Sequence, residues 1–387
     1  MTSDMKNRIQ KIFLLLFTFF FVLIIGELVL AYPVYYFFKE GKSSYYKSYA
    51  NRVALNPYLW VKADPLLGYI PRENVKIKKQ TPSGTKIALR KNALYDYQSN
   101  KYGFRYRDDL TQDKPIEETR VFCLGGSTTM GSESPNNMTY PQQLENLIGD
   151  PTVRVINAGV GAYRSIHLLH YYKEHIRKFS PDIITIYSGW NDFEGYLWSS
   201  WGPRDPRAHF FLSQFEVTQH PGARFAFGNL ILKTYYRLTN VNRFENNLLE
   251  AVKSLEWQEE YRINIQELIS LAKSEGVIPV LINFPSPHFE NAPLEAIEFS
   301  DKDLAMAGRW NANVASLRAT RKIIKKLAHE NNISLIDVNE RFEKENSDFK
   351  KKFSYFVDRM HLTPEGNTLI GETILPSIKN ILKVRNQ

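Results

Sequence analysis

Two short segments far apart in the chain together hold the residue types needed for nucleophilic catalysis. The first contains Ser127 in the run Gly125-Gly-Ser-Thr-Thr129, and the second contains Asp358 and His361 in the run Asp-Arg-Met-His. A carboxylate three residues before a histidine can fold behind the imidazole, fix its tautomer and stabilise the imidazolium that forms when the ring accepts a proton. A serine hydroxyl beside such a ring can attack an acyl carbon. The glycine pair would also suit a phosphate-binding loop, but the Gly-Lys-Ser/Thr ending of a P-loop is missing.

Two further loops could supply hydrogen-bond donors for a negatively charged oxygen. Residues 157–162 (NAGVGA) are small, and their backbone N–H groups can face a ligand, although a tight turn between a strand and a helix fits this piece at least as well. Asn191, in Gly189-Trp-Asn-Asp192, can present a neutral amide, which stabilises developing negative charge without a proton of its own to lose. An ordinary Asn-Asp turn is the alternative for this segment.

A common scaffold must position these four segments, and the hydrophobic pattern indicates which one. Short, continuously apolar runs alternate with helical stretches from residue 119 to residue 387. Continuous apolarity predicts strands buried on both faces, and the helices between them are the crossovers that parallel strands require. We therefore expect an α/β domain, a three-layer α/β/α sandwich with a mainly parallel five-stranded sheet. The expected strands are 120–124, 153–156, 182–187, 278–283 and 334–338, and the expected helices are 140–148, 165–179, 250–275, 313–330 and 364–382.

The places of the four segments in this pattern strengthen the catalytic interpretation. Three of them directly follow expected strands, and in an open parallel sheet the loops at the carboxyl ends of strands build the site. The fourth is followed by Thr363 and Pro364, which suit the N-cap and the first position of the last expected helix. These two residues would hold the loop of His361 firmly, as a positioned base requires.

The runs GGSTT, NAGVGA, GWND and DRMH, in this order and spacing, resemble the four sequence blocks of the SGNH/GDSL hydrolase superfamily. The likeness is close over about residues 120–200 and 355–375 and looser between them. It implies a flavodoxin-like sheet, with Ser127 as nucleophile, His361 as general base and Asp358 as the residue that orients it. The resemblance further implies an oxyanion hole, whose expected donors are the Ser127 N–H, a backbone N–H at Gly161 or Ala162, and the Asn191 amide.

The sequence departs from the family pattern at two positions. The Gly-Asp-Ser of the family name is Gly-Gly-Ser here, so Gly126 replaces the acidic residue; the nucleophile is retained and a supporting contact is lost. The second-block glycine of the family, counted from Asn157, falls on Ala162, with Gly161 just before it. A backbone donor does not need glycine, and the sequence leaves open which N–H points inward.

The resemblance implies a serine esterase or acylhydrolase that needs no cofactor and no metal. Ser127 would attack an ester carbonyl, His361 would take the proton and return it to the leaving alcohol, and an acyl-enzyme would form. Water would complete the cycle in an esterase acting on an acylated, in particular an O-acetylated, envelope component. A glycan hydroxyl would complete it in an O-acyltransferase. A non-catalytic relative that binds a glycan or lipid is a further alternative, but it would not need all four polar side chains together.

The N-terminal part of the chain predicts a membrane anchor. Residues 12–26 are uncharged and almost wholly apolar, and the apolar character resumes after Glu27 as far as residue 38. A helix over 20 of these residues would be about 30 Å long, roughly the thickness of the hydrocarbon core of a bilayer. Basic residues precede it, so we expect 1–11 in the cytoplasm, a single-pass signal-anchor over 12–38 in the inner membrane, and an extracytoplasmic, periplasmic catalytic domain. A cleaved signal peptide is the alternative.

Three regions surround or interrupt the expected domain. Residues 39–118 are polar, rich in tyrosine and broken by proline, which predicts a lead-in arm that lies on the domain without chemistry of its own. Strand-like runs occur in it at 75–78 and 86–89. Insertions at 193–245 and 284–310 leave the carboxyl ends of expected strands, and the aromatic side chains of the first could line an acyl pocket, contact the membrane or simply pack.

Composition and charge limit the remaining function classes. The 387 residues are 43% hydrophobic and 24% charged, as in ordinary globular proteins. The net charge is +9, but the aromatic residues do not alternate with basic ones, so we expect an acylated small molecule, lipid or polysaccharide and the membrane as partners, and no nucleic acid. The single cysteine, Cys123, excludes an internal disulfide.

His167, His170 and His175 fall on one expected helix, but no further ligand cluster accompanies them, so we expect no metal site and interpret them as part of a helix surface.

Overall fold

The structure, a computed structural model, describes residues 10–22, 24–25, 60–64, 66–80, 94–198, 248–287, 307–344, 349–358 and 360–385. The chain divides into two units, one formed by 1–59 and 210–241 and the other by 60–209 and 242–387. The described residues of the first unit are helical, and all the candidate site residues belong to the second unit.

The N-terminal helix covers the beginning of the expected anchor. It comprises residues 10–22 and 24–25, and its large apolar side chains between Ile12 and Ile25 are exposed. Residues 26–38 of the expected anchor lie outside the described residues. Within the part of the chain that the structure describes, no helix combines the length and the apolar character needed to cross a bilayer.

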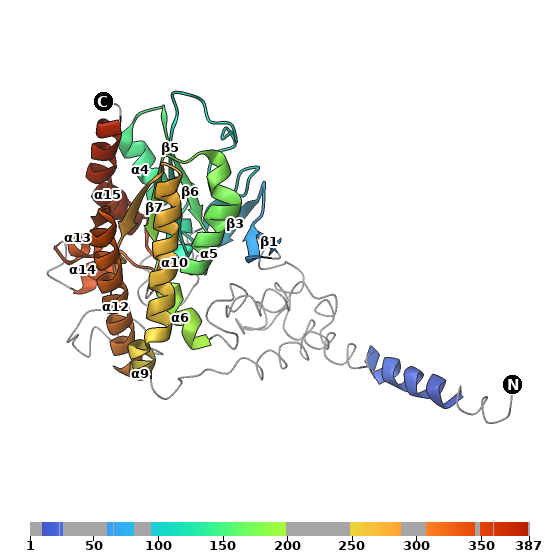
Figure 1. Ribbon diagram of the computed structural model, residues 1–387. Helices are drawn as coiled ribbons and strands as arrows, with labels where there is room; N and C mark the ends of the chain where they lie inside the picture. Colours follow the sequence, from blue (N-terminus) through green and yellow to red (C-terminus); the bar gives the residue numbers. More distant parts are fainter. Residues whose placement is uncertain are drawn as a thin grey trace. The chain divides into compact units, whose positions relative to one another are not determined.

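A five-stranded, entirely parallel sheet forms the centre of the second unit (Figure 1). Its spatial order places the first strand between the second and the third, as in flavodoxin-like folds, and confirms the expected sheet. β5 and β7 are almost wholly buried, because their continuous apolar runs fill both faces of the sheet. In spatial order the strands are β6 (Val153–Gly159), β5 (Thr119–Gly125), β7 (Ile183–Tyr187), β8 (Ile278–Ile282) and β9 (Ser334–Ile336).

Helices cover both faces of this sheet and complete three layers (Figure 1). On one face, Cys123 of β5 shares a core with Leu144 of α4 (Tyr140–Ile148) and Ile370 of α15 (Pro364–Arg385). On the other face, Phe122 packs against Phe179, and α5 (Ser165–Tyr171) lies against α10 (Leu255–Ser274). α12 (Ala307–Asn331) contacts both α10 and β9. The remaining helices are α3 (Ser127–Met130), α6 (Trp190–Trp198), α9 (Leu248–Lys253), α13 (Val338–Lys344) and α14 (Phe349–Ser354), with a 3₁₀ turn at Asn136–Met138.

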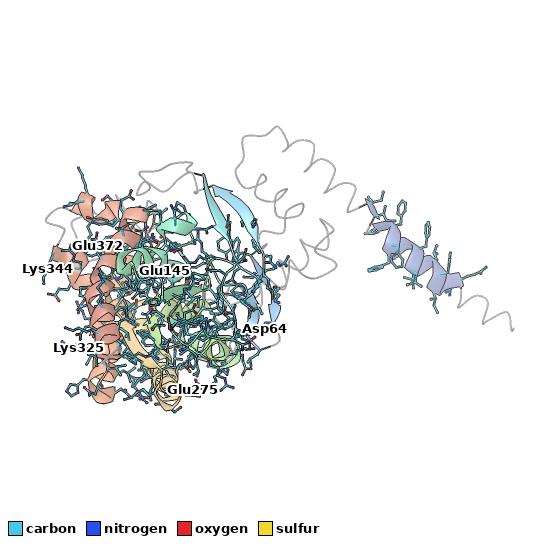
Figure 2. The ribbon with its side chains drawn as sticks, turned by 90° about the horizontal axis from the view of Figure 1, so that it is seen from above. Asp64, Glu145, Glu275, Lys325, Lys344 and Glu372 are labelled. Atoms are coloured by element: carbon cyan, nitrogen blue, oxygen red, sulfur yellow. The ribbon has the colours of Figure 1, made fainter. Side chains whose placement is uncertain are left out.

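The outward faces of these helices are polar, which is the pattern expected of helices that cover a sheet. Figure 2 shows Lys325 of α12, Lys344 of α13 and Glu372 of α15 at the periphery of the second unit, and all three are exposed. The opposite faces of the same helices supply core side chains such as Leu317 and Ile374.

Two expected helices are interrupted. The helix expected over 165–179 ends at Tyr171 and continues as a π-helical turn (Tyr172–Ile176) and a 3₁₀ turn (Arg177–Phe179). The helix expected over 250–275 is divided into α9 and α10 at Ser254, whose hydroxyl accepts the backbone N–H of Glu256 and so caps α10.

The described part of the arm lies on the sheet domain. Of its residues, 60–64, 66–80 and 94–118 are described, and the expected strand at 86–89 lies outside them. β1 (Val61–Asp64) pairs antiparallel with β2 (Gly68–Pro71), and β3 (Lys76–Gln80) pairs antiparallel with β4 (Leu94–Gln98). The buried ring of Phe104 packs edge-on against Phe122 and Phe179, with centroids 5.4 and 5.2 Å away.

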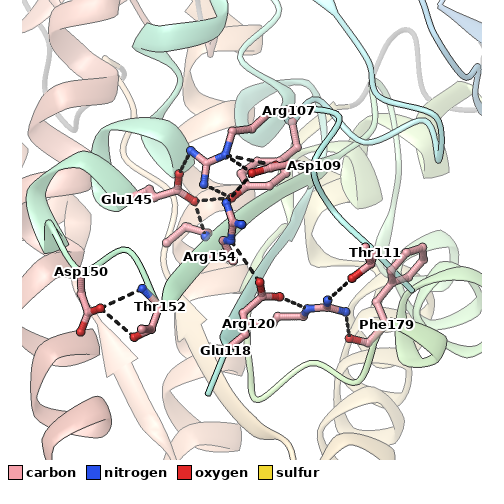
Figure 3. A network of polar contacts seen from close by, with 12 residues as sticks. Arg107, Asp109, Thr111, Glu118, Arg120, Glu145, Asp150, Thr152, Arg154 and Phe179 are labelled. Atoms are coloured by element: carbon pink, nitrogen blue, oxygen red, sulfur yellow. Dashed lines mark hydrogen bonds and ion pairs between the residues drawn. The ribbon is translucent and has the colours of Figure 1, made fainter. Parts of the chain in front are cut away.

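A network of ion pairs attaches the end of the arm to the second strand and the first long helix of the domain (Figure 3). Arg107 Nη1 lies 2.6 Å from Glu145 Oε1 of α4. Arg154 of β6 contacts Asp109 at 2.8 Å and Glu118 at 3.1 Å. Glu145 is buried and already accepts the backbone N–H of Val155 at 2.7 Å, so the arm adds a charged partner to a desolvated carboxylate.

Candidate active site

Ser127 begins a single helical turn, α3, directly after β5. The turn is possible because the strand ends in glycine. A Cβ on Gly125 would lie 2.0 Å from Oγ1 of Thr129 and 2.6 Å from the carbonyl oxygen of Tyr187, so no other residue fits this close approach. The chain therefore turns sharply at the carboxyl end of β5 and places the half-buried Ser127 at that end of the sheet.

The segment with His361 forms a tight loop before α15. The backbone N–H of Val357 donates to the carbonyl oxygen of His361 at 2.7 Å, and the N–H of Thr363 donates to that of Tyr355 at 2.9 Å. The hydroxyl of Thr363 accepts the N–H of Gly366 at 3.2 Å, as expected of an N-cap. These bonds limit the movement of the loop and fix the direction in which His361 points.

The structure brings Ser127, His361 and Asp358 into one chain of hydrogen bonds. His361 Nε2 lies 2.8 Å from Ser127 Oγ, and His361 Nδ1 lies 2.7 Å from Asp358 Oδ2. The other carboxylate oxygen accepts the backbone N–H groups of Met360 and His361 at 2.9 and 2.8 Å. Burial acts to raise the pKa of Asp358, but attraction to His361 and these hydrogen bonds lower it to about 2. The carboxylate is therefore ionised at neutral pH and can stabilise an imidazolium.

Asn191, in the first turn of α6, shares a small cavity with Ser127. Its Nδ2 donates to the carbonyl oxygen of Tyr163 at 3.0 Å. The same nitrogen lies against the backbone of Gly126, where a Cβ would be 2.7 Å away. The cavity is lined by Gly126, Ser127, Thr128, Tyr163, Tyr187, Ser188, Gly189, Trp190, Asn191, Phe284 and Met360.

Gly161 and Ala162, the expected second-block donors, do not line this cavity. The carbonyl oxygen of Gly161 accepts the hydroxyl of Tyr69 from the arm at 2.7 Å. Ala162 has a φ of +66°, which is unusual for a residue with a side chain. Tyr163, the residue directly after the second block, lines the cavity instead. The oxyanion role of Gly161 or Ala162 stays a prediction.

Sequence analysis did not single out Asp192, a buried carboxylate beside Asn191. Its Oδ1 accepts the N–H of Ser165 at 2.9 Å and the hydroxyl of Ser165 at 2.5 Å, while Asn264 Nδ2 donates to that hydroxyl at 3.0 Å. Burial raises the pKa of Asp192, although the bonds from Ser165 and the charge of Arg164 oppose this. Its place directly after Asn191 was the available signal, but the sequence does not reveal its burial.

Two of the three histidines of the 165–179 segment, His167 and His175, pack against aromatic rings. His167 is fully buried and stacks on Tyr163, with ring centroids 4.9 Å apart, so the expectation of a histidine on a helix surface was wrong for this residue. His175 lies 5.3 Å from the ring of Tyr171. Over the described ranges, no group of three or more His, Cys, Asp or Glu residues could hold a metal ion. Most of both insertions, including Trp201, lies outside the described residues.

Comparisons with known proteins identify the family. The model of the GDSL-like lipase/acylhydrolase family matches residues 123–369, more than half of the chain. No curated protein matches the sequence.

Among solved structures, the chain is similar to a putative lipolytic protein of the G-D-S-L family from Desulfitobacterium hafniense, with 16% identity, a TM-score of 0.40 and coverage of 67% of this chain and 99% of that one. It is also similar to a catalytic mutant of an acetylxylan esterase from Geobacillus stearothermophilus, with 13% identity, a TM-score of 0.42 and coverage of 69% of this chain and 96% of that one. A lipase/acylhydrolase from Enterococcus faecalis is similar with 16% identity, a TM-score of 0.41 and coverage of 68% and 96% of the two chains. On the family match, the chain belongs to the GDSL-like lipase/acylhydrolase family and is an ester-bond hydrolase.

Proposed function

We propose that the protein is a serine esterase in which Ser127 is the nucleophile, His361 the general base and Asp358 the residue that orients the base. The observation that carries this proposal is the continuous hydrogen-bonded chain from Asp358 through His361 to Ser127, which opens on a cavity that also holds the Asn191 amide. A base within hydrogen-bond reach of a hydroxyl, itself held by a carboxylate, is the arrangement that activates a serine.

The reaction follows from these positions. Ser127 Oγ attacks the ester carbonyl carbon while its proton passes to His361 Nε2, and Asp358 stabilises the resulting imidazolium. Asn191 uses one of its two amide hydrogens on Tyr163, which leaves the second for the oxyanion, together with the Ser127 N–H and a second-block N–H. His361 then protonates the leaving alcohol, the acyl-enzyme forms, and water activated by the same histidine releases the acid.

The cavity beside Ser127 favours a short acyl group. It is small and partly open to solvent. Its aromatic walls restrain one another, because Phe284 stacks on Tyr187 at 4.8 Å and lies 6.1 Å from Trp190. We propose an acetyl ester of an envelope component as the substrate, since a longer chain would have to displace these packed rings.

We also propose that residues 12–38 anchor the protein in the inner membrane, with the catalytic domain outside the cytoplasm. The apolar composition of this segment and the basic residues before it support the proposal. So does the described N-terminal helix, whose large apolar side chains are exposed. Alkaline carbonate should leave the protein in the membrane fraction while detergent releases it; release by carbonate would contradict an integral anchor.

The catalytic proposal is tested by turnover of 4-nitrophenyl acetate by the full-length protein in mild detergent. Ser127→Ala should lower kcat by about 10³-fold or more, because it removes the hydroxyl that is hydrogen-bonded to His361 Nε2. Ser316→Ala is the matched control, since its buried hydroxyl donates to Asn313 within α12 and should leave kcat unchanged. A serine-directed phosphonate should modify Ser127. Equal rates for Ser127→Ala and the wild type, or an adduct on another residue, would contradict the proposal.

Two product measurements refine the substrate. The rate should fall from acetyl to butyryl to octanoyl esters. Trp190→Ala should widen the cavity and so reduce the difference in rate between the acetyl and the octanoyl ester. With an acetylated polysaccharide, free acetate is the expected product whether or not an acceptor glycan is present. Transfer of the acetyl group to the glycan would favour the O-acyltransferase alternative.

A further inference from the structure

The guanidinium of Arg105, in the lead-in arm, closes the carboxyl end of the helical turn that carries Ser127. Its Nη1 donates to the carbonyl oxygens of Met130 and Gly131, both at 2.6 Å, and its Nη2 donates to that of Ser134 at 2.7 Å. Arg105 is only 6% exposed, so these bonds form away from water.

These carbonyl groups need a partner from outside the helix. A helix of four residues satisfies few of its own carbonyl oxygens, and the last ones always lack an intrahelical donor. Met130 and Gly131 are buried, which makes an unpaired carbonyl oxygen costly there. The Gly131 oxygen also accepts the backbone N–H of Ser134 at 3.0 Å. Arg105 adds charged donors to both oxygens, and its planar fork fixes the positions of the acceptors relative to one another.

Asn136, in the 3₁₀ turn of the domain, and Tyr97, in the arm, hold the guanidinium in place. Arg105 Nε donates to Asn136 Oδ1 at 2.8 Å, and the guanidinium carbon lies 5.0 Å from the ring centre of Tyr97. The backbone N–H of Arg105 donates to the carbonyl oxygen of Asn157 at 3.2 Å, and Asn157 Nδ2 donates to Met130 at 3.4 Å. One arm residue therefore contacts both the segment of the nucleophile and the second block.

The segment held by Arg105 also contacts the loop of His361. Ser134 Oγ donates to the carbonyl oxygen of Leu362 at 3.5 Å and accepts Asn367 Nδ2 at 2.9 Å. Leu362 directly follows His361, and Asn367 lies in α15 behind that loop. The position of the Ser134 segment thus affects both partners of the hydrogen bond between Ser127 and His361.

We propose that Arg105 is a positioning residue for the reaction: it sets the position of Ser127 relative to His361 through the backbone that follows the nucleophile. The inference rests on the proposed role of Ser127. It gives the arm a part in catalysis, although Arg105 is absent from the lining of the cavity.

The test compares Arg105→Ala and Arg105→Lys with Arg120→Lys in the full-length protein. Arg120 is the matched control, because it is also a fully buried arginine that donates to a carbonyl oxygen, that of Phe179, but it lies at the opposite end of β5. We measure kcat and KM with 4-nitrophenyl acetate, the rate of phosphonate labelling and the unfolding temperature. Arg105→Ala should lower kcat by about 10²-fold, the effect of misplacing a reacting group by about 1 Å, and should slow labelling to a similar extent. KM should change by less than about 3-fold, because Arg105 does not line the cavity.

Chemical rescue separates positioning from stability. Millimolar guanidinium should restore part of the kcat of Arg105→Ala, by about 10-fold, and should not raise that of Arg120→Lys. Arg105→Lys should fall between the wild type and Arg105→Ala, because a single ammonium cannot reproduce the fork. The inference is overturned if folded Arg105 variants keep kcat within about 2-fold of the wild type, or if their losses only follow the unfolding temperature as in Arg120→Lys.

A milder variant covers the case in which both Arg105 variants fail to fold. Asn136→Ala removes one acceptor from a half-buried position and should lower kcat about 3-fold with unchanged KM; a folded Asn136→Ala protein with unchanged kcat and labelling rate would overturn the inference. Retained activity in Ser127→Ala would instead overturn the proposed function, whatever the Arg105 variants show.

Discussion

A Cβ on Gly126 would lie 2.7 Å from Nδ2 of Asn191, closer than two such atoms can approach. The backbone of the nucleophile loop and the candidate oxyanion donor are therefore in direct contact, and the missing side chain at position 126 makes the contact possible. The carbonyl oxygen of Tyr163 holds the same amide from the other side at 3.0 Å. In this chain, the glycine that replaces the acidic residue of the family pattern determines where the Asn191 amide can lie.

Gly126→Ala should therefore impair catalysis through Asn191. The added methyl group would push the amide away from the position that the oxyanion needs, and we expect kcat to fall by about 10²-fold, as when an oxyanion donor is removed. The unfolding temperature should change little, because the end of a side chain moves rather than the backbone. Gly161→Ala is the matched control: its Cβ would meet only Cε of Met130, at 3.9 Å, and it keeps the backbone N–H.

A double-mutant cycle identifies the cause. If Gly126→Ala acts by displacing the amide, it should have almost no further effect once Asn191→Ala has removed that amide. An equal loss in the Asn191→Ala background would show that the methyl group disturbs something else, such as Ser127 itself.

Asp358→Asn should lower kcat by about 10⁴-fold while leaving the fold intact. The amide is similar in shape to the carboxylate, but it cannot stabilise the imidazolium and favours the wrong tautomer of His361. Steady-state kinetics with 4-nitrophenyl acetate measures the loss. A fall of less than about 10-fold would mean that Asp358 does not act through the histidine.

The lowered pKa of Asp358 also predicts a dependence of stability on pH. Since the pKa falls from 3.8 in the unfolded chain to about 2 in the folded one, the ionised carboxylate stabilises the fold fully above about pH 4 and loses this effect as the pH falls through about 2. The difference in unfolding free energy between the wild type and Asp358→Asn should therefore shrink between pH 5 and pH 2. A difference that stays constant over this range would contradict the pKa assignment.

Much of the scaffold could be predicted because its signals are local. Continuous apolar runs predict the five buried strands, and the glycines after β5 predict the sharp turn at Ser127. The break after Tyr171 could not be predicted, because Tyr172 and Ile176 of the π-helical turn keep the spacing of buried side chains that a continuous helix would have. The contacts of Arg105 could not be predicted either: its acceptors are mostly backbone carbonyl groups, which every residue has, and they lie 25 to 29 residues away in the chain.

The second block, residues 157–162, shows that the sequence can identify a segment of the site without identifying which residue faces the ligand. Counting from Asn157 points to Gly161 or Ala162, whereas Tyr163, directly after this block, is the residue that lines the cavity with Ser127. A positive φ at Ala162 redirects the chain between them. Because sequence spacing carries no backbone torsion angle, it identifies the block but not the residue that faces the ligand.

Asp192→Asn should stabilise the protein relative to the wild type at neutral pH. The pKa of Asp192 is raised by burial, so the folded state favours the protonated carboxyl group; this contribution is present at low pH and is lost as the pH rises through the raised pKa. Asparagine can still accept both hydrogen bonds of Ser165 without carrying a charge. The unfolding temperature of the variant minus that of the wild type should therefore increase from pH 4 to pH 8.

Asp182→Asn is a control that should change the stability at neutral pH in the opposite direction. Asp182 is equally buried, but hydrogen bonds from Lys114 and the backbone N–H of Arg120 outweigh its desolvation and lower its pKa. Its charge therefore stabilises the fold above the ordinary aspartate pKa, and the variant should be less stable than the wild type at neutral pH. If Asp192→Asn and Asp182→Asn changed stability in the same direction with pH, the opposite pKa shifts of the two aspartates would be refuted.

Cys123 should not react with thiol reagents in the folded protein. The thiol is fully buried in β5, between Asn157 of β6 and Thr185 of β7, and burial raises its pKa to about 12. The reactive thiolate is therefore almost absent at pH 8, and the reagent has no access to the sulfur. We expect no labelling by an aromatic disulfide reagent and no loss of esterase activity under native conditions, but one equivalent of labelling after unfolding in guanidinium chloride. Labelling of the native protein that proceeds faster than its unfolding, or inactivation by the reagent, would place a reactive thiol beside Ser127 and contradict the packing of β5.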